Sequence, residues 1–218
     1  MFSFGDQCDR NAKAQVMNMT KMAVLLAGVG LAALIGGTAA YTLTAGGADC
    51  DVASAVGAPI GGPFELVNAE GELVTDADVI DRPALVYFGY TFCPDVCPFD
   101  VARNALAVDI LKEQGEDVAL VFVTIDPARD TPEVLAGYAE DMHPKMIALT
   151  GSDEQVKQAA DAYRAYYARG SGDEEFYLMA HSNFTYLMMP GNELATFFRA
   201  EETPEGMAEK SACMINAA

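Results

Sequence analysis

One stretch of fifteen residues, Ala84–Pro98, reads ALVYFGYTFCPDVCP and decides how the rest of the chain is interpreted. Its first half, Ala84–Tyr90, is a continuous run of mostly apolar and aromatic residues, which is typical of a central strand buried on both faces of a sheet. Helical spacing follows over Pro98–Gln114, and Pro98 suits a first helical turn because its missing N–H would have no partner there. The stretch therefore predicts a strand, a short loop and a helix, with two cysteines at the helix start.

Cys93 and Cys97 are the reactive side chains between the predicted strand and the predicted helix. Two cysteines four apart at a helix start can present both sulfurs on one side of the first turn. The unpaired N–H groups of the helix N-terminus lower a thiol pKa and favour the thiolate, which attacks disulfides or binds soft metals. On spacing alone, a structural disulfide or a pair of inert buried thiols stays open. A self-contained zinc site is disfavoured, because it normally needs four ligands and no second such pair is present.

Strands and helices alternate on both sides of this stretch. A second buried strand is expected at Val118–Ile125, and helices are expected to begin after the N-caps Thr131 and Ser152, the second running to about Tyr167. The other expected elements are a hairpin of Phe64–Val67 with Glu72–Thr75, strands at Met146–Leu149, Tyr177–Ala180, Phe184–Met189 and Leu194–Phe198, and a terminal helix from Thr203. This order predicts an α/β fold with a partly parallel sheet, an N-terminal hairpin and an antiparallel edge hairpin.

The chain has two histidines. His181 follows the predicted strand Tyr177–Ala180, and strand ends in an open α/β sheet cluster at the crevice where sites form. On this pattern alone, a structural histidine is an equal alternative. His143 precedes Pro144 at the end of a predicted helix, where a cation suits the helix dipole, so a structural or surface role is expected for it.

Charge divides the chain into two unequal parts. Residues 22–48 carry no charged side chain, whereas the residues from Asp49 onward carry 10 Lys and Arg against 30 Asp and Glu. A helix of about 20 apolar residues crosses a bilayer core, so residues 22–44 are predicted to form one uncleaved transmembrane anchor. The basic residues before this run and the acidic ones after it predict a cytoplasmic tail at residues 1–21 and an exported C-terminal domain. A cleaved signal peptide is the alternative.

These boundaries predict a single-pass protein of the inner (cytoplasmic) membrane, with a linker at residues 45–63 and a periplasmic domain at residues 64–218.

The 13 basic and 32 acidic residues give a net charge of −19, which speaks against binding to nucleic acid. A hydrophobic content of 51% rules out a disordered acidic protein. Five cysteines are too few for a disulfide scaffold of this length.

Several motifs occur together in a recognisable order. They are Tyr87–Pro98, Thr124–Pro132, Leu149–Gly151, His181-Ser182 and Tyr186–Gly191. In this order they resemble the Sco/SenC family, membrane-anchored copper chaperones for cytochrome c oxidase, over about residues 58–216. The resemblance implies a thioredoxin-like fold, with copper bound by the sulfurs of Cys93 and Cys97 and a nitrogen of His181. It gives no ligand role to the Asp126–Pro132 motif.

The chemistry of the three residues agrees with this resemblance. Two thiolates and an imidazole suit Cu(I) and can also hold Cu(II), whereas carboxylate-rich sites suit harder ions. In thioredoxins a cis-proline precedes the strand that faces the cysteine pair; here His181 and Ser182 hold that segment, so that a metal ligand could face the sulfurs. Met179 and Met188 offer further soft ligands, although methionines in strands usually fill the core.

Two functions from different classes are compatible with this site. The first is a metallochaperone that takes copper at Cys93, Cys97 and His181 and delivers it to the oxidase subunit carrying the CuA site. The second is a thiol–disulfide oxidoreductase in which the redox-active pair Cys93/Cys97 keeps the copper-ligand cysteines of that subunit reduced. Other periplasmic copper chaperones or thioredoxin-like reductants are further expected partners. A peroxidase that uses a low-pKa cysteine is a third alternative.

Three cysteines lie outside the candidate site. Cys8 belongs to the predicted cytoplasmic tail and Cys50 lies beside the predicted membrane segment. Cys213 falls in the terminal helix, where a buried apolar role is expected. The sequence leaves open whether Cys50 and Cys213 pair.

Overall fold

The computed structural model describes residues 50, 59–173 and 176–217. The predicted cytoplasmic tail, the predicted transmembrane anchor and most of the linker lie outside these residues. Within the described ranges, no helix is both long enough and apolar enough to cross a membrane.

Nine strands are described, and seven of them form one mixed sheet in the order β2-β1-β5-β4-β3-β8-β9. The strands are β1 Glu65–Asn68, β2 Leu73–Thr75, β3 Ala84–Gly89, β4 Ala119–Thr124, β5 Met146–Thr150, β6 Tyr167–Gly172, β7 Tyr177–His181, β8 Thr185–Met189 and β9 Glu193–Phe198. Strands β3, β4 and β5 are parallel, while the hairpins β1–β2 and β8–β9 close the two edges with antiparallel pairing. The predicted N-terminal hairpin, parallel centre and edge hairpin are therefore confirmed.

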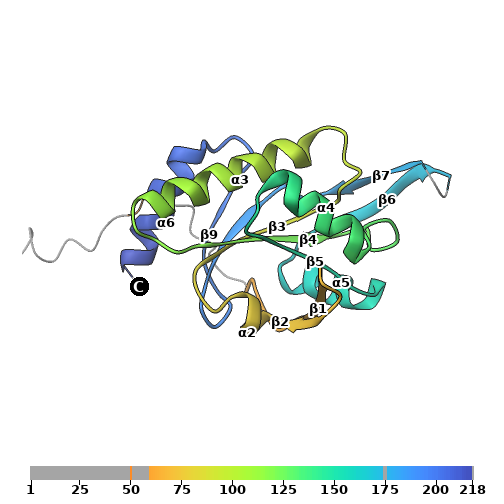
Figure 1. Cartoon of the computed structure of the whole chain (residues 1–218), viewed down its shortest axis with the longest axis horizontal. Helices are drawn as coiled ribbons and strands as arrows, with labels where there is room; N and C mark the ends of the chain where they lie inside the picture. Colours follow the sequence, from red (N-terminus) through yellow and green to blue (C-terminus); the bar gives the residue numbers. More distant parts are fainter. Residues whose placement is uncertain (1–49, 51–58, 174–175, 218) are drawn as a thin grey trace, which may run out of the picture. The chain divides into compact units, whose positions relative to one another are not determined.

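Helices cover both faces of this sheet. They are α2 Asp76–Val79, α3 Val96–Glu113, α4 Pro132–Met142, α5 Asp153–Ala162 and α6 Pro204–Ala217. Helices α3 and α4 lie on one face with α6 beside α3, and α5 lies on the other (Figure 1). Strands β6 and β7 form a separate hairpin that extends from one end of the molecule (Figure 1).

The local signals in the sequence explain most of these elements. Every residue of β3 and β4 is buried, as expected for apolar strands covered on both faces. The Thr131 hydroxyl accepts the N–H of Val134 at the start of α4, and Ser152 forms a capping box with Gln155 at the start of α5. Both predicted caps are confirmed.

The prediction that the helix after Ser152 runs to about Tyr167 is wrong. Helix α5 ends at Ala162, and Arg164 adopts a left-handed backbone conformation with φ of 52° that the helix cannot continue through. Tyr167 instead begins β6, a strand that the sequence analysis did not predict because its run YARGSG lacks alternating apolar residues. Strand β6 gains its structure from pairing with β7, in which Tyr167 lies opposite His181.

The expectation of a buried apolar role for Cys213 is also wrong. Cys213 in α6 forms a disulfide with Cys50, across a sequence separation of 163 residues. Sequence alone left this pairing open because connectivity depends on where the fold places each sulfur.

Candidate metal centre

The loop between β3 and α3 places two sulfurs at the N-terminus of a helix. Cys97 lies in the first turn of α3, and its backbone N–H donates to the sulfur of Cys93 at 3.4 Å. The N-cap residue, Asp95, makes no side-chain cap hydrogen bond. The Cys93 sulfur thus receives N–H groups that a capping side chain would otherwise take.

The two thiols differ in acidity because their surroundings differ. Burial raises the pKa of Cys93, but hydrogen bonds from the amides of Asp95, Cys97 and Val96 outweigh this and leave its pKa below the usual value. Burial raises the pKa of Cys97, which is fully buried, to about 12. Cys93 is therefore the thiol that more readily provides a thiolate, and it is also the more exposed of the two.

His181, the last residue of β7, completes the group. Its Nε2 atom lies 3.2 Å from the Cys97 sulfur, and its Nδ1 atom lies 2.8 Å from the backbone carbonyl oxygen of Ser182. A carbonyl oxygen can only accept, so Nδ1 carries the proton and the lone pair of Nε2 faces the sulfurs. Ligand atoms of Cys93, Cys97 and His181 all lie within 4.8 Å of one another, close enough to share one metal ion.

Two tyrosine rings and one glycine shape the wall around this group. Tyr87 and Tyr90 each meet the His181 ring edge to face, with ring centroids 6.3 and 5.9 Å away. A Cβ atom at Gly89 would lie 2.8 Å from the Tyr87 ring and 3.3 Å from the Cys97 sulfur. The close approach of the sulfur to β3 therefore requires glycine at this position.

Comparisons with known proteins identify the group to which this arrangement belongs. The SCO1/SenC family model matches residues 52–216. The chain is 46% identical over 207 residues to Protein SenC of Rhodobacter capsulatus, which covers 92% of this chain and 94% of that protein. This chain belongs to the SCO1/SenC family.

Solved structures agree with that assignment. The crystal structure of Arabidopsis thaliana ScoI with copper bound has a TM-score of 0.70 and 37% identity, and covers 73% of this chain and 99% of that chain. Yeast Sco1 with copper bound has a TM-score of 0.65 and 33% identity, and covers 70% of this chain and 86% of that chain. The thioredoxin-like fold expected from the motifs is confirmed.

The SCO1/SenC chain carries a buried polar network behind Cys97 that the sequence analysis missed. The Tyr87 hydroxyl donates to Asp100 at 3.0 Å and also hydrogen-bonds to the Cys97 thiol. Asp100 forms an ion pair with Arg103 at 3.0 Å, and both side chains are more than nine-tenths buried. Arg103 also donates to Thr185 and to the carbonyls of Arg199 and Ala200. The signal in the sequence was the spacing of Asp100 and Arg103, which carry opposite charges three residues apart in a largely apolar part of the predicted helix.

The Asp126–Pro132 motif hydrogen-bonds to the two segments that carry the ligands and does not itself supply one. Asp130 accepts hydrogen bonds from the backbone and hydroxyl of Thr91, in the loop that carries Cys93. Asp126 accepts the hydroxyl of Tyr177, in the strand that ends at His181. Burial raises the pKa of Asp130, against the hydrogen bonds from Thr124 and Thr91. The motif thus ties the cysteine loop to the strand that carries the histidine.

The remaining candidates occupy several other positions in the fold. His143 caps the end of α4, and its Nε2 lies 3.4 Å from Asp109, which agrees with the structural role expected for it. Met188 is fully buried in the core, and Met179 packs against the core. Cys8 lies outside the described residues.

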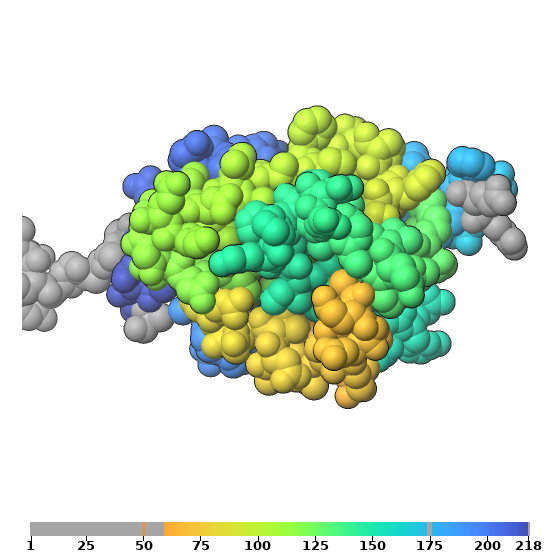
Figure 2. Space-filling model, viewed as in Figure 1, coloured from red at the N-terminus to blue at the C-terminus, as the bar shows by residue number. Residues whose placement is uncertain are grey.

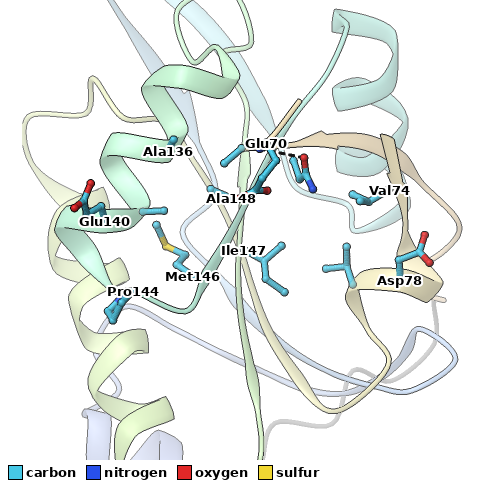
Figure 3. Close-up of a pocket in the computed structure, with 13 residues that line it drawn as sticks. Glu70, Val74, Asp78, Ala136, Glu140, Pro144, Met146, Ile147 and Ala148 are labelled. Carbon is cyan, nitrogen blue, oxygen red and sulfur yellow. Dashed lines mark hydrogen bonds between the residues drawn. The ribbon is translucent and has the colours of Figure 1, made fainter. Parts of the chain in front are cut away.

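A separate hollow of about 510 Å³ lies beside α4, over β5 and the β1–β2 hairpin (Figure 3). Apolar side chains, among them Val74 and Ile147, form its floor, and the carboxylates of Glu70, Asp78 and Glu140 stand around it. No thiol or imidazole is among the residues that line it, so it lacks the soft ligands of the cysteine–histidine centre.

Proposed function

We propose that this chain binds copper through Cys93, Cys97 and His181 and passes it on as a metallochaperone. The observation that carries the proposal is the convergence of two sulfurs with a histidine nitrogen whose tautomer leaves its lone pair facing them. This ligand set suits copper, and the ScoI and Sco1 relatives hold copper in their crystal structures. Three protein ligands leave a coordination position open, through which a receiving ligand can enter.

The recipient in this proposal is the cytochrome c oxidase subunit that carries the CuA site. Membership of the SCO1/SenC family supports this choice. The proposal places the domain in the periplasm, held to the inner membrane by residues 22–44. The uncharged run of residues 22–48 and the basic residues before it support this topology. The Cys50–Cys213 disulfide supports it as well, because disulfides persist in oxidising compartments.

A second role, reduction of the CuA cysteines, is favoured by the unequal acidity of the free thiols. The Cys93 thiolate would attack a disulfide of the partner, and Cys97 would then displace the partner sulfur. This exchange transfers two electrons and two protons to the partner and leaves a Cys93–Cys97 disulfide. His181 supplies no electrons to this reaction, so the two roles make different demands on it.

Replacement of His181 with alanine separates the two roles. We expect His181→Ala to weaken Cu(II) binding by more than about 100-fold, because only the two sulfurs remain as ligands. Disulfide exchange with a small disulfide substrate should stay within about three-fold of wild type. His143→Ala, at the capping histidine, is the matched control and should change neither property.

Copper titration with optical detection of the thiolate-to-copper band, together with stopped-flow exchange kinetics, measures both properties. Unchanged copper affinity in His181→Ala would contradict the metal centre. Loss of disulfide exchange together with copper binding would contradict the separation of roles.

A further inference from the structure

The surface around the metal centre is unusually apolar for so acidic a chain. Among the described residues, nine large hydrophobic side chains are exposed. Three of them, Phe92, Val96 and Phe99, lie within two residues of a ligand cysteine, and a fourth, Phe176, meets Phe92 with ring centroids 6.4 Å apart. We call these four residues the collar. Exposed apolar patches on soluble domains mark contact sites for other molecules.

The collar is built from two elements that also carry the ligands. Phe92, Val96 and Phe99 belong to the loop and first turn that hold the cysteines, and Phe176 precedes β7, which ends at His181. The start of α3 and the β6–β7 hairpin lie at the same end of the molecule (Figures 1 and 2). A molecule seated on the collar would therefore lie at the same end of the molecule as the centre.

Burial of the sulfurs explains why a partner has to make contact at this place. Cys97 is fully buried and Cys93 is 8% exposed, so a receiving ligand has to enter the mouth of the site to exchange bonds with the metal. Apolar side chains at the mouth favour a partner surface that is itself apolar, since contact then removes both from water.

The charges near the collar favour one kind of incoming ligand. Residues from Asp49 onward carry a net charge of −20, but the segment 90–99, on the cysteine side of the collar, contains one carboxylate, that of Asp95. On the other side, three acidic residues, 173–175, precede Phe176 in the sequence. The guanidinium of Arg129 stacks 4.7 Å from the Phe92 ring and 3.6 Å from the Tyr177 ring, and Arg169 stacks 3.8 Å from Tyr177. Arg129 is paired with Asp126, so the cysteine side of the mouth carries little net charge and suits an uncharged loop that brings thiols.

We propose that the collar is the docking surface for the protein that exchanges copper with this chain, and that its occupant is an apolar loop bearing the partner's own metal-binding thiols. The proposal rests on the metallochaperone function and names the surface through which it acts. Each sulfur of this chain that releases the metal takes up a proton, and each receiving thiol loses one. Copper keeps its oxidation state in the exchange.

The test compares transfer to a protein with extraction by a small chelator. The full chain, loaded with one Cu(I), is mixed with the purified CuA domain of the oxidase subunit or with bathocuproine disulfonate. The collar variant is Phe99→Ser/Phe176→Ser, whose side chains are 75% and 66% exposed and are not ligands. The control is Leu73→Ser, at a leucine that is 59% exposed on β2 and lies outside the collar.

We expect the collar variant to transfer copper to the CuA domain at least about ten-fold more slowly at low domain concentration, because two apolar contacts are lost. The rate at saturating domain should be close to wild type. The control variant should stay within about two-fold in every assay, and chelator extraction should be the same for all three proteins.

Each other outcome has a distinct meaning. Equal transfer rates to the CuA domain would overturn the collar while leaving the metallochaperone function intact. Equal slowing towards the chelator and the domain would place the effect in the metal centre and also overturn it. Absence of transfer from wild type would overturn both the proposed function and the occupant. If wild type self-associates, the collar variant does not, and both transfer copper at the same rate, the surface is assigned to a second copy of the chain.

Discussion

The described residues contain two pairs of cysteines, one free and one joined by a disulfide bond. Cys93 and Cys97 are four residues apart and free, whereas Cys50 and Cys213 are 163 residues apart and joined. In the free pair, each sulfur faces a group that can stabilise a thiolate or share a metal: backbone amides at Cys93 and the imidazole of His181 at Cys97. No such neighbours are described for the joined pair. The comparison teaches that closeness in sequence does not decide whether two cysteines form a structural disulfide or a pair of free thiols that can bind a metal.

The two pairs also lie at different ends of α3. Helix α6 runs alongside α3, since Arg103 donates to the carbonyl of Ala200 and Asn216 donates to Glu116, just beyond the end of α3. Cys213 lies one turn before Asn216, whereas Cys97 lies in the first turn of α3. At about 1.5 Å per residue, α3 separates the pairs by roughly 20 Å. Their contributions to binding and to stability should therefore be separable.

The largest effect is expected from Cys97→Ser. A hydroxyl is a poor ligand for a soft metal, so we expect copper affinity to fall by more than about 100-fold. The free energy of unfolding should change little, because the substitution keeps the size of the side chain. Competition titration against a copper chelator and urea unfolding of the full chain measure the two quantities. Retained copper binding would remove Cys97 from the centre.

The opposite pattern is expected from Cys50→Ser/Cys213→Ser. Removing a cross-link that closes so long a loop should lower the free energy of unfolding by about 3–5 kcal/mol. Copper affinity should stay within about two-fold, because the disulfide is remote from the ligands. The same two measurements apply, with the reduced wild-type chain as a further reference. A copper affinity that falls with stability would show that the pairs are coupled.

A smaller change tests how tightly the free pair is enclosed. Gly89→Ala places a Cβ atom 2.8 Å from the Tyr87 ring, 3.1 Å from the Phe122 ring and 3.3 Å from the Cys97 sulfur. We expect overpacking to cost about 1–3 kcal/mol of stability. Displacement of the sulfur should also lower copper affinity by roughly ten-fold.

Gly137→Ala is the matched control for this substitution. Nothing lies within 4 Å of a Cβ atom at this helical position, so alanine should stabilise the chain by about 0.5–1 kcal/mol through its helix propensity. Thermal unfolding and copper titration report both variants. An unchanged affinity and stability in Gly89→Ala would show that β3 and Cys97 can move apart without cost.

The sequence predicted the elements whose signals are local. The apolar runs of β3 and β4 and the caps at Thr131 and Ser152 lie within a few residues of what they determine, and all were found where expected. Strand β6 was missed because its partner β7, not its own residues, stabilises it. The same reason explains the disulfide, since Cys50 and Cys213 meet only through the packing of α6.

The candidate site divides in the same way. Local sequence indicated the thiols of Cys93 and Cys97. Only the family resemblance selected His181 as a ligand, because on pattern alone a structural role was equally expected for it. The role of Asp126 and Asp130 could not be predicted, because their partners Tyr177 and Thr91 are far away in the chain. Long-range hydrogen bonds of this kind leave no periodic signal in the sequence.

The smallest effect concerns the charge behind the free pair. Asp100 is buried and paired with Arg103, and it accepts the hydroxyl of Tyr87, whose ring meets that of His181. With two thiolates and one imidazole, a bound Cu(I) gives the centre one negative charge more than a bound Cu(II). Asp100→Asn removes a nearby negative charge, keeps an acceptor for the Tyr87 hydroxyl, and leaves Arg103 bonded to Thr185 and two carbonyls. The substitution should therefore favour the Cu(I) form.

We expect Asp100→Asn to raise the Cu(II)/Cu(I) midpoint potential by on the order of tens of millivolts, where 59 mV corresponds to a ten-fold change in equilibrium constant. Asp109→Asn, on the same helix but with its carboxylate exposed beside His143, is the control and should leave the potential unchanged. Potentiometric titration of the copper-loaded chain measures both. A lower potential in Asp100→Asn would mean that the network acts on the site through geometry instead of charge.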